Sequence, residues 1–247
     1  MKTIIYGDKD KDVILLLHGG GLSYWNYKKE AELLKDNFCV VLPVLDGHTG
    51  SDSIFTSIED CADRIISYID ENFNGKVLLI GGLSLGAQVV VEILLKRNDI
   101  ASYAIIESAS LIPSKLTHAL INPSISMSYG LIKKKWFSKL QFKSLHISED
   151  YFSDYYRDTC KISKKDMIFF LKANTKYEPK EGLENCLVKT RIIVGKKEPR
   201  KMRKSAKNLN QLLPKSYLEI KNKYYHGDYS LNHAREYVDD LLRMIKK

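Results

Sequence analysis

The chain has 247 residues, of which 44% are hydrophobic and 28% are charged, and it carries a formal net charge of +9 at pH 7. A chain of this length can bury one large core, no apolar run is long enough to span a membrane, and the N-terminus has no apolar signal segment. We therefore expect a cytoplasmic protein without stable membrane insertion, and the spread of the excess lysines without a nucleic-acid-binding motif argues against a nucleic-acid partner.

Continuous apolar runs predict strands that are buried on both faces of a parallel sheet. They cover residues 13–17, 39–44, 77–80, 101–106 and 191–194. Weaker strand patterns at residues 3–6 and 217–220 begin and end the predicted sheet.

Helical patterns lie between these strands. Apolar side chains recur on one face over residues 58–69, behind an N-cap at Ser57, and again over residues 202–213. A third pattern, over residues 231–245, predicts one last helix behind Ser230. Alternating strands and helices predict an α/β fold with a mostly parallel central sheet and helices on both faces. In such a sheet the functional site lies at the carboxyl ends of the strands.

Residues 110–185 break this alternation, since they hold aromatic residues, lysines and short helical stretches but few clean strands. We predict an inserted helical cap there and assign residues 1–109 and 186–247 to the core. The stretch at residues 133–143, which contains Trp136, either packs the cap onto the core or meets a lipid surface, and packing is favoured.

The most informative motif is Gly-Leu-Ser-Leu-Gly at residues 82–86, between a predicted strand and a helical pattern. A serine hydroxyl becomes a nucleophile when a base takes its proton and the backbone holds it clear of its neighbours. A tight turn holds the serine clear of its neighbours. It needs glycine on either side, since a side chain at those positions would collide with the strand or helix. We therefore predict Ser84 as a nucleophile, with the Leu85 amide at a helix start that favours negative charge.

A glycine-rich turn, His-Gly-Gly-Gly at residues 18–21, follows the first buried strand. At the carboxyl end of a strand, such a turn lets backbone amides approach a ligand closely, and with the Leu85 amide it predicts an oxyanion hole. Trp25, just beyond, either lines the acyl pocket or packs the loop. We assign Gly21 and Trp25 as candidate substrate-binding residues.

His226 is the favoured base among the six histidines of the chain. It lies in a loop between the last predicted strand and the last helix, from which it can reach Ser84. His18 and His48 stand in turns beside strands, where bracing of the loops by hydrogen bonds is the favoured interpretation. The others lie in the predicted cap or the last helix: His118, His146 and His233.

Two glutamates compete for the acid that orients His226. Glu198 follows one buried strand and gives the chain order Ser, Glu, His, while Glu107 ends another strand at the same edge of the sheet. We prefer Glu198 and keep Glu107 as its rival. Basic residues between 196 and 207 would help to keep Glu198 ionised, although a solvated helix face is the favoured explanation for them.

These features resemble the α/β-hydrolase superfamily, in particular its serine hydrolases with an inserted cap, over nearly the whole chain. The motifs appear in the order of that family: residues 18–21, Asp46-Gly-His48, residues 82–86, the acid after residue 194 and His226. The resemblance implies the α/β-hydrolase fold and an esterase-like or lipase-like activity.

The resemblance also implies a role for each site residue. Ser84 would be the nucleophile, His226 the base and Glu198 the acid. The amides of Gly20 and Leu85 would form the oxyanion hole. Most members of the superfamily have Asp where this chain has Glu198. Glu107 therefore remains an alternative for the acid.

The reaction implied is a two-step acyl transfer that needs no metal or organic cofactor. The four cysteines are scattered without a Cys-x-x-Cys pair, and none is expected to bind a metal. The favoured hypothesis is hydrolysis of a small or medium carboxylic ester, thioester or related carbonyl compound. A carbon–carbon bond hydrolase, an acyltransferase and a non-catalytic binding protein of the same fold are the alternatives, and the oligomeric state is not predicted.

Overall fold

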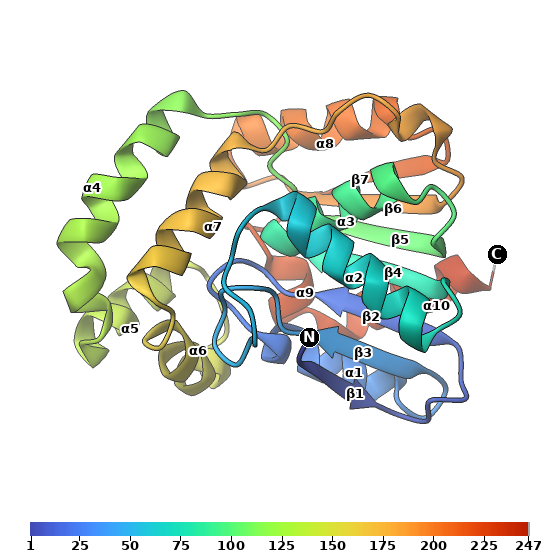
Figure 1. The fold of residues 1–247 in the computed structure, drawn as a ribbon, viewed down its shortest axis with the longest axis horizontal. Helices are drawn as coiled ribbons and strands as arrows, with labels where there is room; N and C mark the ends of the chain where they lie inside the picture. The colour runs from blue at the N-terminus through green and yellow to red at the C-terminus, as the bar shows by residue number, and fades with distance from the viewer. Residues whose placement is uncertain (247) are drawn as a thin grey trace.

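A seven-stranded sheet in the order β1-β3-β2-β4-β5-β6-β7 forms the centre of the computed structural model, which describes residues 1–246 (Figure 1). β1 pairs antiparallel with β3, and the other pairings are parallel. The strands are β1 Thr3–Tyr6, β2 Val13–Leu17, β3 Cys39–Pro43, β4 Val77–Leu83, β5 Ala101–Glu107, β6 Lys189–Gly195 and β7 Ser216–Lys221. The predicted strands and the mostly parallel α/β fold are therefore confirmed.

The central strands are buried on both faces, as their unbroken apolar runs predict. In β2, Val13, Leu15 and Leu17 belong to one hydrophobic cluster, while Ile14 and Leu16 belong to another on the opposite face of the sheet. Because successive side chains of a strand point to opposite faces, a strand packed on both sides is apolar at successive positions, as β2 is.

Helices cover both faces of the sheet. The cluster around Leu15 is covered by α2 (Ile58–Asn72), α3 (Leu85–Lys96) and α8 (Arg200–Leu212). The cluster around Leu16 is covered by α1 (Lys28–Leu34), which was not predicted, and α10 (Ala234–Ile245). The Ser57 hydroxyl accepts a hydrogen bond from the Asp60 amide, which confirms the predicted N-cap of α2.

The prediction of one last helix behind Ser230 is wrong. The chain forms a short helix, α9 (Asp228–Asn232), breaks at His233 and then continues as α10. His233 has φ −125° and ψ 45°, outside the helical region, and its ring stacks on that of Tyr224 with the centroids 4.4 Å apart. Apolar side chains keep a helical spacing across the break, so periodicity alone does not reveal it.

The α-helices between β5 and β6, called the helical insertion below, lie to the left of the sheet in Figure 1. They are α4 Lys115–Ile132, α5 Lys135–Ser144, α6 Phe152–Thr159 and α7 Lys164–Lys176. α7 contacts α2 and α3, and α4 packs on α7. Within residues 1–246, no helix has both the length and the apolar character that a membrane span requires.

The favoured packing role for residues 133–143 is only partly correct. Phe142 is buried against Phe152 and Tyr155, with ring centroids 5.4 and 5.1 Å away. Trp136 instead has 66% of its surface exposed, and Phe137 is half-buried. A short amphipathic stretch shows which residues can share a face, but not which face finds a partner.

Candidate active site

Ser84 lies at the apex of the turn between β4 and α3, in a backbone conformation that is rare for a residue with a side chain. Its φ is 54°, in the left-handed region, which costs on the order of 1–3 kcal/mol. Its amide donates to the carbonyl oxygen of Glu107 at 2.9 Å, and its carbonyl oxygen accepts from the Gln88 amide at 3.0 Å. The neighbouring strand and the following helix therefore hold the strained turn from both sides.

Gly82 and Gly86 leave no room for a side chain beside Ser84. A Cβ at Gly82 would lie 2.5 Å from the backbone of Gly86, and a Cβ at Gly86 would lie 2.2 Å from the carbonyl oxygen of Leu17. Both obstacles are backbone atoms of packed elements, which cannot move aside. The close approach of β2, β4 and α3 therefore requires glycine at both positions.

Glu198 is held in a fixed position in the loop after β6. Its Oε1 accepts hydrogen bonds from the Gly195 amide and the Ser108 hydroxyl, both at 2.7 Å. Its Oε2 lies 2.8 Å from Nδ1 of His226. Glu198 is 3% exposed, so these donors replace the water that a carboxylate would otherwise bind.

His226 presents its ring between Glu198 and the cavity. With Nδ1–H donating to Glu198, the other ring nitrogen, Nε2, is left as an acceptor. Desolvation lowers the pKa of His226, but the hydrogen bond to Glu198 and the carboxylates of Glu198 and Glu107 outweigh this, so the pKa is raised above 6.5. The ring is therefore a stronger base than an isolated histidine.

Glu107, the rival acid, does not contact His226 through a hydrogen bond. Its Oε1 accepts from the Ser230 amide at 3.4 Å, and its Oε2 has no partner among the described residues. Burial raises the pKa of Glu107 to about 7, and the nearby charge of Glu198 adds to the rise. Glu107 is therefore a buried carboxyl group that acts on Glu198 and His226 through its charge and not through a hydrogen bond.

Ser84, Glu198 and His226 line one cavity of about 300 Å³. Its apolar lining comes from both the core and the helical insertion: Leu22, Leu83, Leu145, Ile147 and Leu231. Polar side chains at its wall include Ser144, His146, Lys197 and Tyr225. The structure thus brings together the three residues that the sequence places far apart in the chain.

The glycine turn lies directly over the start of α3. Gly20 lines the cavity, and a Cβ at Gly20 would lie 3.5 Å from the Leu85 side chain. The Gly20 amide has no hydrogen-bond acceptor among the described residues, and Leu85, as the first residue of α3, has no acceptor within its helix. Within residues 1–246, the Gly20 and Leu85 amides therefore lie beside Ser84 without a hydrogen-bond acceptor.

His18 and His48 brace the loops around the site, which agrees with the favoured interpretation of both. Nε2 of His18 accepts from the Leu45 amide at 3.1 Å, and Nε2 of His48 accepts from the Gly21 amide at 3.0 Å. Burial lowers the pKa of His18 to about 3 and that of His48 to about 4. Both rings are therefore neutral hydrogen-bond braces.

Two candidate substrate-binding residues do not line the cavity. Trp25 is 1% exposed, and its indole N–H donates to Asp158 at 3.0 Å while its ring packs on Tyr151. Gly21 has its amide bonded to His48, and its carbonyl oxygen accepts from the Thr159 hydroxyl at 3.2 Å. Both residues therefore tie the glycine turn to its surroundings, and the second interpretation of Trp25, loop packing, fits the structure.

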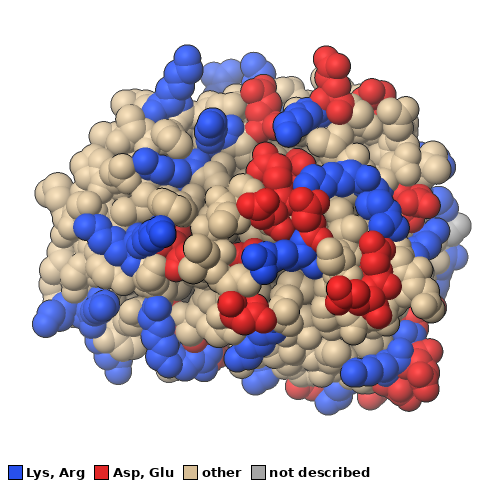
Figure 2. All heavy atoms as spheres, viewed as in Figure 1, with Lys and Arg blue, Asp and Glu red and all other residues tan. Residues whose placement is uncertain are grey.

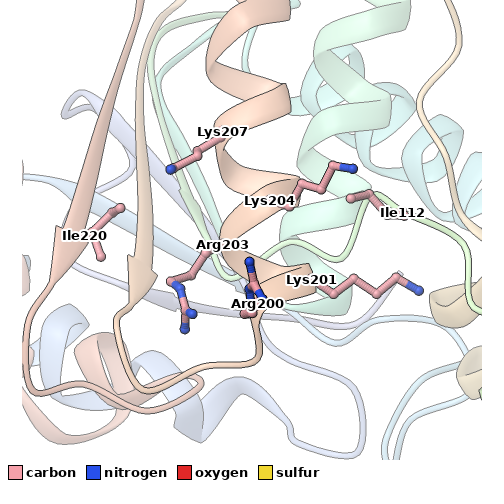
Figure 3. Close-up of a pocket in the computed structure, with 7 residues that line it drawn as sticks. All are labelled: Ile112, Arg200, Lys201, Arg203, Lys204, Lys207 and Ile220. Atoms are coloured by element: carbon pink, nitrogen blue, oxygen red, sulfur yellow. The ribbon is translucent and has the colours of Figure 1, made fainter.

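The basic residues that follow Glu198 line a different cavity, of about 660 Å³, along α8 (Figure 3). They are Arg200, Lys201, Arg203, Lys204 and Lys207. Arg203 donates to the carbonyl oxygens of Lys196 and Glu198, so it fixes the loop that carries the acid. Lys201 donates to the carbonyl oxygen of Pro113 at 2.7 Å, whereas Lys204 and Lys207 are exposed, as a solvated face of α8 predicts.

The fold brings to the site two residues that the sequence did not predict there, Ser108 and His146. Ser108, which donates to Glu198, has φ 55° and follows β5 at the carboxyl edge of the sheet, and that position is the only signal it gave. His146 of the helical insertion stacks on Tyr225 with the centroids 4.0 Å apart, at the wall of the cavity. No pattern in the sequence indicates that His146 and Tyr225 are in contact.

Comparisons with known proteins agree with this architecture. A sequence model of the alpha/beta hydrolase family matches residues 14–203. The chain is similar to an esterase from Exiguobacterium antarcticum, at 17% identity and a TM-score of 0.83 over 99% of this chain and 95% of the other. It is also similar to an enol-lactonase from Burkholderia xenovorans LB400, at 14% identity and a TM-score of 0.81 over 100% and 96%.

A bromoperoxidase from Bacillus anthracis is similar as well, at 16% identity and a TM-score of 0.81 over 99% of this chain and 95% of the other. No curated protein sequence matches the chain. Because these structures carry different activities on one fold, the likeness shows the fold and leaves the reaction to the residues of the site.

Proposed function

Because the chain belongs to the alpha/beta hydrolase family, we propose that it is a serine hydrolase resembling carboxylesterases. Its substrate would be a small or medium carboxylic ester, thioester or related carbonyl compound. The observation that carries this proposal is the cavity that Ser84 shares with the hydrogen-bonded pair His226 and Glu198. The esterase and the enol-lactonase among the similar structures support it.

In the first step, the Ser84 hydroxyl oxygen attacks the carbonyl carbon, and its proton passes to Nε2 of His226. Glu198 keeps the ring oriented through Nδ1–H and stabilises the positive charge that the ring acquires. The amides of Gly20 and Leu85 bind the oxyanion of the tetrahedral intermediate, where the start of α3 favours negative charge.

Collapse of this intermediate transfers the proton from His226 to the leaving alcohol or thiol and leaves an acyl group on Ser84. Water then attacks the acyl carbon while His226 takes a proton from it. The second tetrahedral intermediate releases the carboxylic acid and restores the Ser84 hydroxyl. Both steps use only groups of the chain and water, so we propose a reaction without metal or organic cofactor.

The cavity supports substrates of small or medium size. Its volume, about 300 Å³, is at the low end of the range for small-molecule sites. Leucine and isoleucine side chains line it, which favours an apolar acyl or alcohol group. All four cysteines are free thiols, which supports a reducing compartment such as the cytoplasm.

Hydrolysis of p-nitrophenyl esters of increasing chain length tests this proposal. We expect turnover of the short esters, and its loss by about 10³-fold or more in Ser84→Ala. Ser126→Ala, which alters an exposed serine of α4 outside the cavity, should keep the wild-type rate. Turnover that persists in Ser84→Ala, or no turnover of any ester by folded protein, would contradict the proposal. Product analysis with a competing alcohol distinguishes hydrolysis from acyl transfer.

A further inference from the structure

The outer face of α4 is apolar although it faces solvent. Leu116, Leu120, Met127 and Leu131 recur at helical spacing, so they share one face, and they are between 40% and 82% exposed. A helix that packs on a protein with one face ordinarily carries charged residues on the other. From residue 116 to residue 132, α4 carries no Asp, Glu, Lys or Arg.

α5, which contacts α4, also has exposed apolar side chains. Its inward side chains, Ser138 and Phe142, are buried, while Trp136 and Leu140 are 66% and 62% exposed. The two exposed residues are four positions apart and share one face of α5. We call Leu116, Leu120, Met127, Leu131, Trp136 and Leu140 together the α4–α5 outer face.

The charged side chains of α4, α5 and the residues that flank them have one sign. Between residues 108 and 148 the chain has six lysines and no Asp or Glu. Five of these lysines lie in or just before α5: Lys133, Lys134, Lys135, Lys139 and Lys143. In Figure 2, blue and uncharged side chains occupy the left margin, where Figure 1 places α4 and α5, while the red side chains gather toward the centre and right.

We propose that the α4–α5 outer face docks on the surface of an anionic lipid bilayer. Its leucines and Met127 would enter the boundary between head groups and acyl chains, and Trp136 would lie at the level of the head groups. The lysines of α5 would contact the anionic head groups. This is binding in the plane of the surface, by helices that do not cross it.

The lysines favour a bilayer over a second copy of the chain. A symmetric dimer places the same patch of both copies face to face, so it would bring ten lysines together, and residues 108–148 supply no carboxylate to pair with them. An anionic bilayer offers the opposite charge and an apolar layer below it, which match the lysines and the exposed apolar side chains.

Docking would also bring the cavity close to the lipid. Residues 144–147, which begin with the last residue of α5, line the cavity that contains Ser84. The proposal concerns binding alone, however, and it does not rest on the proposed hydrolase activity. A variant without esterase activity, such as Ser84→Ala, should bind vesicles as the wild type does.

Vesicle binding tests the proposal. The full chain is mixed with vesicles of phosphatidylcholine, with and without phosphatidylglycerol, and bound protein is measured by sedimentation. We expect binding to be at least about tenfold stronger with the anionic lipid and to weaken as salt is raised. Trp136 emission should shift to shorter wavelength on binding, whereas Trp25, 1% exposed, should not respond.

Two variants separate the apolar and charged contributions. Trp136→Ser with Leu140→Ser, and Lys135→Gln with Lys139→Gln and Lys143→Gln, should each lower the partition coefficient by about tenfold or more. Matched changes elsewhere should leave it unchanged: Ile54→Ser with Leu187→Ser, and Lys196→Gln with Lys204→Gln and Lys207→Gln.

Three results would overturn the proposal. The first is absence of binding to anionic vesicles by folded wild-type protein. The second is an equal loss of binding in the matched controls, which would reduce the effect to net charge or general hydrophobicity. The third is self-association without vesicle binding, lost in the Trp136→Ser and Leu140→Ser variant, which would assign the face to a second copy of the chain.

Discussion

The carboxyl edge of the sheet and the α4–α5 outer face depart from ordinary folding preferences in opposite directions. At the edge, Glu198 is buried and accepts three hydrogen bonds, while at the outer face Met127 is 82% exposed and Trp136 is 66% exposed. Burying a carboxylate costs free energy unless donors replace water, and leaving apolar side chains exposed forfeits the stabilisation that burial provides. Departures of this kind are expected where a protein reacts or binds.

Neutralising the buried carboxylate should produce the largest effect. Glu198→Gln keeps the shape of the side chain but removes the charge that holds Nδ1–H of His226, and we expect kcat to fall by about 10⁴-fold. Glu107→Gln changes the neighbouring carboxyl group and should lower kcat by less than about tenfold. Steady-state ester hydrolysis measures both variants, and the reverse ranking would assign the acid's role to Glu107.

Glu107 should make the free energy of unfolding depend on pH. Burial raises its pKa from 4.5 to about 7, so the folded state keeps a proton that the unfolded state has already released. The stability that this proton contributes is complete below about pH 4.5 and is lost as pH rises through about 7, on the order of 3 kcal/mol in total. Glu107→Gln stays neutral and should remove this loss.

Urea unfolding at about pH 4 and about pH 8 measures this effect. The wild type and Glu107→Gln should have similar free energies of unfolding at the lower pH, and the variant should be more stable at the higher pH. If the free energies of unfolding of the two proteins changed equally between the two pH values, Glu107 would ionise as freely in the folded state as in the unfolded state.

Substitutions of Gly86 and Gly130 allow the two regions to be compared directly. A Cβ at Gly86 would lie 2.2 Å from the Leu17 carbonyl oxygen, whereas a Cβ at Gly130, in α4, would meet nothing within 4 Å. Gly86→Ala should lower the free energy of unfolding by about 1–3 kcal/mol. Gly130→Ala should raise it by about 0.5–1 kcal/mol, since alanine favours the helix. Chemical denaturation measures both, and a neutral Gly86→Ala would contradict the tight packing at the turn.

Ser108→Ala should lower kcat far less than Glu198→Gln. Ser108→Ala removes one of the two donors to Oε1 of Glu198, and we expect kcat to fall about tenfold with KM unchanged, since the residue does not line the cavity. An equal change in KM would point to a general distortion of the site instead.

The sequence predicts the sheet well because each central strand is buried on both faces and therefore reads as an unbroken apolar run, as in residues 13–17. It also identifies the turn at Ser84, since the glycines on either side have a local steric cause. The structure brings Ser84, Glu198 and His226 to one cavity, as their placement after buried strands leads one to expect.

Side chains whose partners are distant in the chain could not be predicted. Trp25 bonds to Asp158, 133 residues away, and Ser108 bonds to Glu198, 90 residues away. The exposure of Trp136 was missed for the same reason, because the sequence shows that α5 has two faces but not which one has a partner. Such contacts depend on how the helical insertion packs, and no local pattern records that.

Covalent labelling tests the role of Ser84 as nucleophile most directly. The protein is treated with a fluorophosphonate, and the modified peptide is located by mass spectrometry, with Ser84→Ala and Ser144→Ala treated in parallel. We predict one adduct per chain, on Ser84, that forms in Ser144→Ala and fails to form in Ser84→Ala. Folded wild-type protein that stays unlabelled, or an adduct on another residue that persists in Ser84→Ala, would contradict the assignment of Ser84.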